Sequence, residues 1–114
     1  MQIELKVYSI LREAFGSSSI VVEIAEEGIL ADLITELEKE YGDAFRLKTG
    51  RNLTQDLKDR FDLFLNKQRI RLPEDSRLQL KNNDEIVILQ PVGGGSGNLL
   101  FGELLPFTLV FNSV

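Results

Sequence analysis

The sequence predicts an α+β domain in which one main helix packs across a mixed sheet. Three observations support this fold class: apolar and polar residues alternate directly after the N-terminus, apolar residues recur at helical spacing in 30–41, and strand-like segments return between 62 and 89. Strands that flank a single long helical segment are typical of α+β folds. A chain of 114 residues can bury one self-sufficient core, so we expect one globular unit.

The first elements are predicted to be two strands. In residues 2–8, Ile3, Leu5 and Val7 alternate with polar residues, which indicates a strand buried on one side. Residues 10–19 break this period and end in turn-forming residues, and residues 20–24 are rich in β-branched side chains. We therefore expect a hairpin whose strands are joined across a short loop.

A long amphipathic helix is predicted next, and Gly42 is its expected end because glycine adopts the left-handed conformation without a steric penalty. The apolar stripe of this helix consists of Leu30, Leu33, Ile34, Leu37 and Tyr41. Residues 43–60 show little periodicity that would indicate a helix or a strand, although Leu53, Leu57 and Phe61 at spacing four could form a short second helix.

The later strands are predicted at residues 62–66, 69–72 and 85–89, separated by turns at 67–68, 73–76 and 81–84. The segment 85–89 is a nearly continuous apolar run, which favours a central strand covered on both faces. This last strand leads into Pro91.

Composition excludes several classes of function. The net charge is −5, with 13 basic and 18 acidic residues, and the basic residues are scattered, so we expect no nucleic-acid partner. The chain has no cysteine and no histidine, which removes disulfides, thiolate chemistry and the commonest metal ligand and general base, and we expect no metal site. The N-terminus lacks a basic region followed by an apolar run, so we expect no signal peptide and a cytoplasmic protein.

Three consecutive glycines follow the last predicted strand. Taken alone, Gly93-Gly94-Gly95 before Ser-Gly-Asn would be a flexible linker. Their position directly after a strand and Pro91-Val92 favours a functional terminus instead. Proline has no N–H to donate and biases the residue before it toward extended backbone, so Pro91 ends the pairing and directs the glycines outward.

Three stretches resemble the MoaD and ThiS sulfur carriers, and they resemble MoaD more than ThiS. They are residues 10–16 (ILREAFG), 64–68 (FLNKQ) and 83–95 (NDEIVILQPVGGG), and together they fix the register over residues 1–95. The resemblance implies a ubiquitin-like β-grasp fold over residues 1–92. A Gly-rich flexible arm at 93–98 and an apolar C-terminal extension at 99–114 would follow it.

The resemblance also implies a carrier and not an enzyme. In that family the terminal Gly-Gly carboxylate is adenylated by an ATP-dependent enzyme related to ubiquitin activators. It then becomes a thiocarboxylate that donates sulfur, for example in molybdopterin biosynthesis, or in some relatives it forms an isopeptide bond with a lysine. By position, Gly94 and Gly95 would be the activated end, with Pro91, Val92 and Gly93 as the partner-binding arm.

The partners implied are the adenylating enzyme first, and second a molybdopterin synthase large subunit or target-protein lysines. No cofactor would be bound, because ATP is used by the partner.

The chain departs from this family at Ser96. Nineteen further residues follow, so Gly95 has a peptide bond in place of a free carboxylate and cannot be adenylated in the full-length chain. Ten of the 19 are apolar, but with Glu103 and Pro106 among them the segment is too short and too interrupted to cross a bilayer, which needs about 20 apolar residues. We therefore expect no membrane span.

Four accounts of the extension remain open. A peptidase cuts the Gly95-Ser96 bond of a precursor; the extension folds back along the sheet edge or onto its open face; it pairs with another chain by strand addition; or it comes from a shifted reading frame or another artefact. The first account predicts a sulfur carrier that is active after cleavage. The alternative function is a β-grasp interaction module or small modifier precursor, whose extension docks on itself or a partner without sulfur chemistry.

Overall fold

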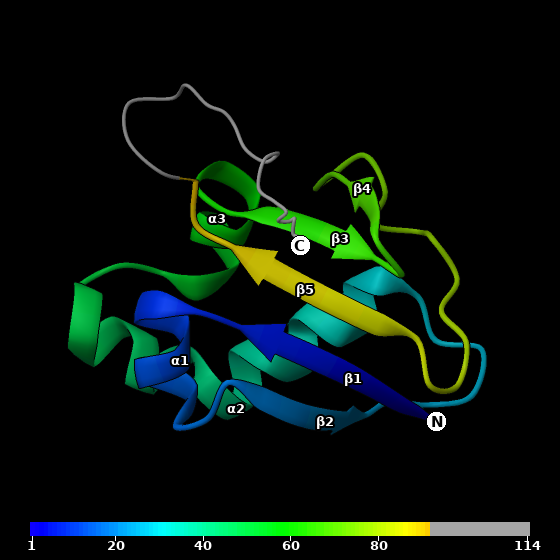
Figure 1. The fold of residues 1–114 in the computed structure, drawn as a ribbon, viewed down its shortest axis with the longest axis horizontal. Coiled ribbons are helices and arrows are strands. Elements are labelled where there is room, and N and C mark those ends of the chain that lie inside the picture. The colour runs from blue at the N-terminus through cyan, green and yellow to red at the C-terminus, as the bar shows by residue number, and fades with distance from the viewer. Residues whose placement is uncertain (92–114) are drawn as a thin grey trace.

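The computed structural model describes residues 1–91, which form a five-stranded mixed sheet and three helices (Figure 1). The elements are β1 (Gln2–Val7), α1 (Ser9–Phe15), β2 (Ser19–Glu23), α2 (Leu30–Thr49), α3 (Leu53–Asp59), β3 (Asp62–Leu65), β4 (Gln68–Ile70) and β5 (Glu85–Leu89). The strand order is β2-β1-β5-β3-β4, with β1 and β5 parallel and the other neighbours antiparallel. This arrangement confirms the predicted α+β class.

The core lies between the sheet and α2, which crosses behind the sheet in Figure 1. The alternation in β1 places Ile3, Leu5 and Val7 in this core, all fully buried, as predicted. The predicted stripe of α2 is also buried, apart from Tyr41, which is partly buried and stacks on Phe15 of α1 with 4.3 Å between the ring centroids.

The prediction of a short loop between the first two strands is wrong in one respect. The strands pair antiparallel as expected, but α1 lies between them. Leu11, Ala14 and Phe15 of α1 are buried, and Gly16 ends the helix at φ 81° with its N–H donating to the Arg12 carbonyl. Seven residues are too few to show a clear helical repeat, so the amphipathic character of α1 was not visible as periodicity.

The predicted helix end at Gly42 is also wrong. Gly42 lies inside α2, which runs on to Thr49 and ends at Gly50, in the left-handed conformation at φ 74°. The extra turns are held because Phe45 is buried and packs edge-on against Phe61, with 6.4 Å between the ring centroids. Tertiary burial therefore outweighs the weak helix propensity of one glycine.

A second helix does form in residues 43–60, where no clear periodicity is visible in the sequence. It is α3, capped at its start by Asn52, whose side chain accepts a hydrogen bond from Gln55 N at 2.9 Å. Leu53 and Leu57 are buried, as the spacing of four indicated, while Phe61 follows the helix and is buried just before β3.

The strand β5 is central, between β1 and β3, but only one of its faces is fully covered. Ile86 and Ile88 are buried in the core, whereas Glu85, Val87 and Leu89 are half-buried on the face opposite α2. We call this second face the outer face. Its partial exposure corrects the expectation of a strand covered on both sides.

Candidate functional site

The candidate site is the point where the chain leaves β5. Of the predicted site residues, the structure describes Pro91, which is exposed and follows the end of β5 by two residues. Val92, Gly93, Gly94 and Gly95 lie outside the described residues, as do the predicted arm at 93–98 and the extension at 99–114. The described part of the site is therefore its base in the sheet.

That base is held on both sides. Val87 pairs with Lys6 of β1 and with Phe64 of β3, and Leu89 pairs with Asp62 at the last position of the ladder. Beyond it, Pro91 has no N–H to donate, so it cannot extend the ladder from its own nitrogen. The chain thus leaves the sheet from its central strand.

A hydrogen-bonded pair of turns fixes where β5 begins. Asn66, in the left-handed conformation at φ 47°, donates from Nδ2 to Asp84 Oδ1 at 2.9 Å and accepts at Oδ1 from Glu85 N at 2.9 Å. Asp84 Oδ2 also accepts from Lys81 N at 2.7 Å. The stretches 64–68 and 83–89 are therefore one bonded unit, and it sets the register of the strand that carries the arm.

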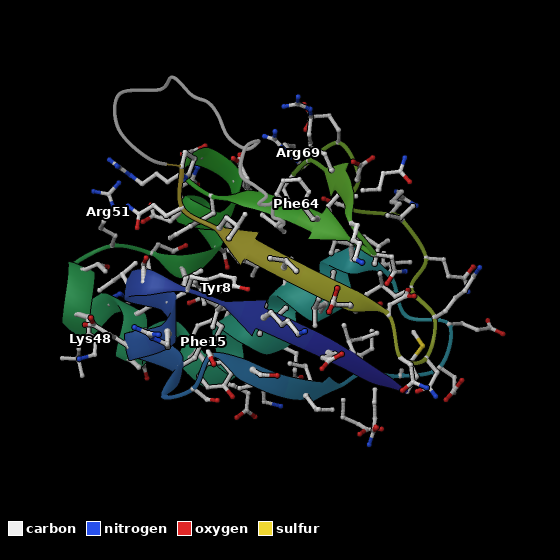
Figure 2. All side chains as sticks on the ribbon, in the orientation of Figure 1. Tyr8, Phe15, Lys48, Arg51, Phe64 and Arg69 are labelled. Carbon is white, nitrogen blue, oxygen red and sulfur yellow. The ribbon has the colours of Figure 1, made fainter. Side chains whose placement is uncertain are left out.

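Apolar side chains gather on the outer face around the chain exit, and we call Tyr8, Phe64, Val87 and Leu89 the exit cluster. Register places Val87 beside Phe64, and continuing the parallel pairing Val7↔Ile88 by one residue places Tyr8 beside Leu89. Tyr8 is 45% exposed, and the other three are half-buried. Figure 2 shows Tyr8 at the end of β1 next to β5.

Ion pairs flank the exit cluster. Lys6 Nζ lies 3.2 Å from Glu85 Oε2, and this hydrogen bond, followed by the attraction between the two charges, raises the pKa of Lys6 above its ordinary value of 10.5. On the other side, Arg69 Nη2 donates to Asp62 Oδ1 at 2.7 Å, and its guanidinium carbon lies 6.0 Å from the centre of the Phe64 ring (Figure 2).

The sequence reasoning missed the exit cluster. The signal was present, because Phe64 and Val87 occupy the polar phase of their strands, where a side chain points away from the core. In the sequence alone, each of these apolar residues indicates only that its segment favours a strand. That they are neighbours becomes clear only from the register of the sheet.

Few other features of the described residues indicate a functional site. Within residues 1–91, no group of three or more acidic side chains converges to hold a metal ion. In the same range, none of the helices has the length and apolar character needed to span a membrane. A shallow groove of about 100 Å³ between α3 and β4 is lined by Leu57, Phe61 and Ile70 with Lys58, Arg69 and Arg71 among its other walls.

Solved structures with the same fold include carriers and modifiers. The chain is similar to small archaeal modifier protein 1 from Methanosarcina acetivorans, with 26% identity, a TM-score of 0.60, and coverage of 82% of this chain and 96% of that one. It is similar to a chain of the complex of subunits 1 and 2 of molybdopterin-converting factor from Helicobacter pylori (19% identity, TM-score 0.53, 83% and 100% covered).

A third similar structure is a chain of the Amycolatopsis orientalis BexX/CysO complex (20% identity, TM-score 0.57, 82% and 99% covered). These likenesses confirm the β-grasp fold. No curated protein matches the sequence.

The ThiS family matches residues 5–95. This stretch holds the second half of β1, every later element of the sheet and the helices, and the residues after β5 as far as Gly95. Ser96 and the extension lie beyond it. On this match and the fold, the chain belongs to the ThiS family of ubiquitin-like sulfur carriers, which are carrier proteins and not enzymes.

Proposed function

We propose that the chain is a sulfur carrier of the molybdopterin type, whose working group is the carboxylate of Gly95 after removal of the residues behind it. The observation that carries this proposal is that the family match runs through the three glycines and ends at Gly95. Carriers of this family bind no cofactor, and ATP is used by the adenylating partner.

The chemistry uses no side chain of this protein. A carboxylate oxygen of Gly95 attacks the α-phosphate of ATP and releases pyrophosphate. A sulfide-level donor then attacks the acyl carbon, AMP leaves, and a thiocarboxylate remains. Glycine suits Gly94 and Gly95 because a backbone without Cβ can approach the nucleotide closely in a narrow channel.

The first step must be hydrolysis of the Gly95-Ser96 peptide bond, since the full-length chain has no carboxylate at Gly95. We assign this step to a processing peptidase. Pro91, Val92 and Gly93 would form the part of the arm that enters the partner, and the two-sided pairing of β5 would hold its base still during transfer.

The partners in this proposal are a ubiquitin-activator-like adenylating enzyme and the large subunit of a molybdopterin synthase, both cytoplasmic. Support for the second comes from the similar Helicobacter pylori structure, which is a complex of two subunits of molybdopterin-converting factor. The similar BexX/CysO structure is a different complex, so we also consider sulfur acceptors other than a molybdopterin precursor.

A second candidate function is a small protein modifier joined to target lysines. The observation that favours it is the likeness to the archaeal modifier, which at 26% has the highest identity of the structures described above. The same freed Gly95 would then form an isopeptide bond after adenylation. A binding module without chemistry at Gly95 is the remaining alternative.

Intact mass separates these functions. The protein is isolated from its native cell and measured before and after incubation with its adenylating enzyme, ATP and sulfide. The carrier proposal predicts a species that ends at Gly95 and gains the mass difference between sulfur and oxygen. Attachment to other proteins through Gly95 would indicate the modifier.

Two glycine variants serve as a matched pair in the same experiment. Gly95→Val should abolish adenylation because a branched side chain blocks close approach, whereas Gly97→Val should leave it unchanged because that residue is removed. A mass that includes Val114 under every condition would contradict both the carrier and the modifier.

A further inference from the structure

We propose that the apolar segment 99–114 docks on the exit cluster of its own chain and covers the outer face of the sheet. The proposal goes beyond the sulfur chemistry and does not depend on it, because docking is a property of the uncleaved chain. The segment that would occupy the exit cluster, residues 99–114, lies outside the described residues.

The outer face offers a site for an apolar partner. The described helices bury their apolar sides in the core on the other side of the sheet, whereas Tyr8, Phe64, Val87 and Leu89 form a contiguous cluster that retains access to solvent. Among residues 1–91, the other large apolar side chains with high exposure are Val21, Leu47 and Leu78, and they lie on other elements. Contiguous apolar surface favours association, whereas single exposed residues do not.

Two ion pairs flank the cluster. Lys6 pairs with Glu85 at 3.2 Å and Arg69 with Asp62 at 2.7 Å. An incoming segment therefore meets an apolar centre flanked by charges that are already paired, and it needs few charges of its own. This is the arrangement typical of the core and rim of protein interfaces.

The segment 99–114 matches that surface in composition. Its only charged side chain is Glu103, and its apolar residues make it unsuited to remain in water. These residues are Leu99, Leu100, Phe101, Leu104, Leu105, Phe107, Leu109, Val110, Phe111 and Val114.

The segment can also reach the cluster. The described chain leaves the sheet at Pro91, beside Leu89, and residues 92–98 separate it from Leu99. Seven residues span up to about 23 Å when extended, and a five-residue strand such as β5 is about 17 Å long. The spacer is thus long enough for the segment to turn back over β5 in the same chain.

A spin label tests the docking in the full-length protein. The chain has no cysteine, so Ser113→Cys gives one attachment site for a nitroxide. We expect strong broadening of the amide signals of Phe64, Val87 and Leu89, and little broadening of Glu36 and Lys39 on the far side of α2. Uniform broadening, or broadening confined to residues outside the outer face, would overturn the proposal.

A matched pair of variants separates docking from a change in fold. Val87→Thr and Val21→Thr each replace one methyl group by a hydroxyl at an outward-facing position, one inside the exit cluster and one on the edge strand β2. Val87→Thr should reduce the broadening at Phe64 at least twofold, and Val21→Thr should leave it unchanged. Equal effects of the two variants would contradict the assignment to the cluster.

Mixing labels distinguishes the source of the contact. If ¹⁵N-labelled chain without nitroxide is broadened by added spin-labelled chain, the segment docks on a second copy, and the intramolecular proposal fails. Loss of docking would leave the mass experiment on Gly95 unaffected, so each proposal can fail without the other.

Discussion

Asp56 is the one charged residue that is buried among residues 1–91. Its side chain is 7% exposed and lies between two arginines, with Oδ2 2.9 Å from Arg51 Nε and Oδ1 3.7 Å from Arg60 Nε. A buried carboxylate is tolerated when opposite charges and hydrogen bonds compensate its desolvation. Asp56 therefore ties the turn after α2 to the end of α3.

We expect Asp56→Asn to lower the free energy of unfolding by about 1–3 kcal/mol, because the charge that both arginines approach is removed while the site stays buried. Urea denaturation measures the change. Asp59→Asn is the control on the same helix, since Asp59 is exposed, and it should change stability by less than about 0.5 kcal/mol. Equal losses in the two variants would refute this role of Asp56.

Lys6 gives a pH-dependent prediction. Its pKa is raised by the hydrogen bond and charge of Glu85, so the pair stabilises the fold below the pKa of the unfolded state, and this stability is lost as the pH rises through the higher pKa of the folded state. Glu85→Gln should lower the pKa of Lys6 toward 10.5, as seen by NMR titration.

Stability at neutral pH should fall by less than about 1 kcal/mol in Glu85→Gln, because Lys6 is 41% exposed and solvent screens the pair. Glu4→Gln is the matched control, since Glu4 raises the pKa of Lys6 less than Glu85 does. A larger pKa change from Glu4→Gln would show that the assigned partner is wrong.

At the scale of an element, α2 shows why a helix end is hard to predict from a glycine. Gly42 lies inside the helix, and the space where its Cβ would lie is filled by the carboxylate of Glu38 from the preceding turn. Glu38 Oε1 accepts hydrogen bonds from Thr54 N at 3.0 Å and Thr54 Oγ1 at 2.6 Å, which join α2 to α3. The residue that looked like a stop makes room for a contact between helices.

Gly42→Ala should therefore destabilise the protein by about 1 kcal/mol, although alanine alone favours a helix over glycine by about 0.8–1 kcal/mol. The added methyl displaces Glu38 and breaks its bonds to Thr54. In a Glu38→Ala background the same change should become stabilising. A double-mutant cycle in urea measures the reversal of sign, and a stabilising effect in both backgrounds would contradict the explanation.

At the scale of the whole molecule, residues 43–60 prove to contribute large side chains to the core. Phe45 is 1% exposed, whereas Leu47, two residues later in α2, is 88% exposed. Phe45→Ala should lower the free energy of unfolding by about 3–5 kcal/mol, and Leu47→Ala should change it by less than about 0.5 kcal/mol. Thermal and urea unfolding test this pair, and similar small losses would mean that the segment packs less tightly than described.

Much of the fold could be predicted because its signals are local. The alternation in β1, the stripe of α2 and the apolar run of β5 each reflect burial on one face. The helix α1, the last turns of α2 and the exit cluster could not, because they depend on which distant residues meet. For the candidate site, the sequence alone indicated the glycines, and the structure added their base in the sheet and the apolar surface around it.

The parallel pairing of β1 with β5 also has a mechanical consequence. The chain enters β1 at one end of the sheet and leaves β5 at the other, so a force between Met1 and Pro91 pulls the two strands along their length in opposite directions (Figure 1). The ladder from Glu4↔Glu85 to Val7↔Ile88 is then loaded in shear, and its hydrogen bonds must yield together instead of opening one by one. An unfolding machine that grips the protein by its arm would meet its strongest resistance at the first strand it tries to extract.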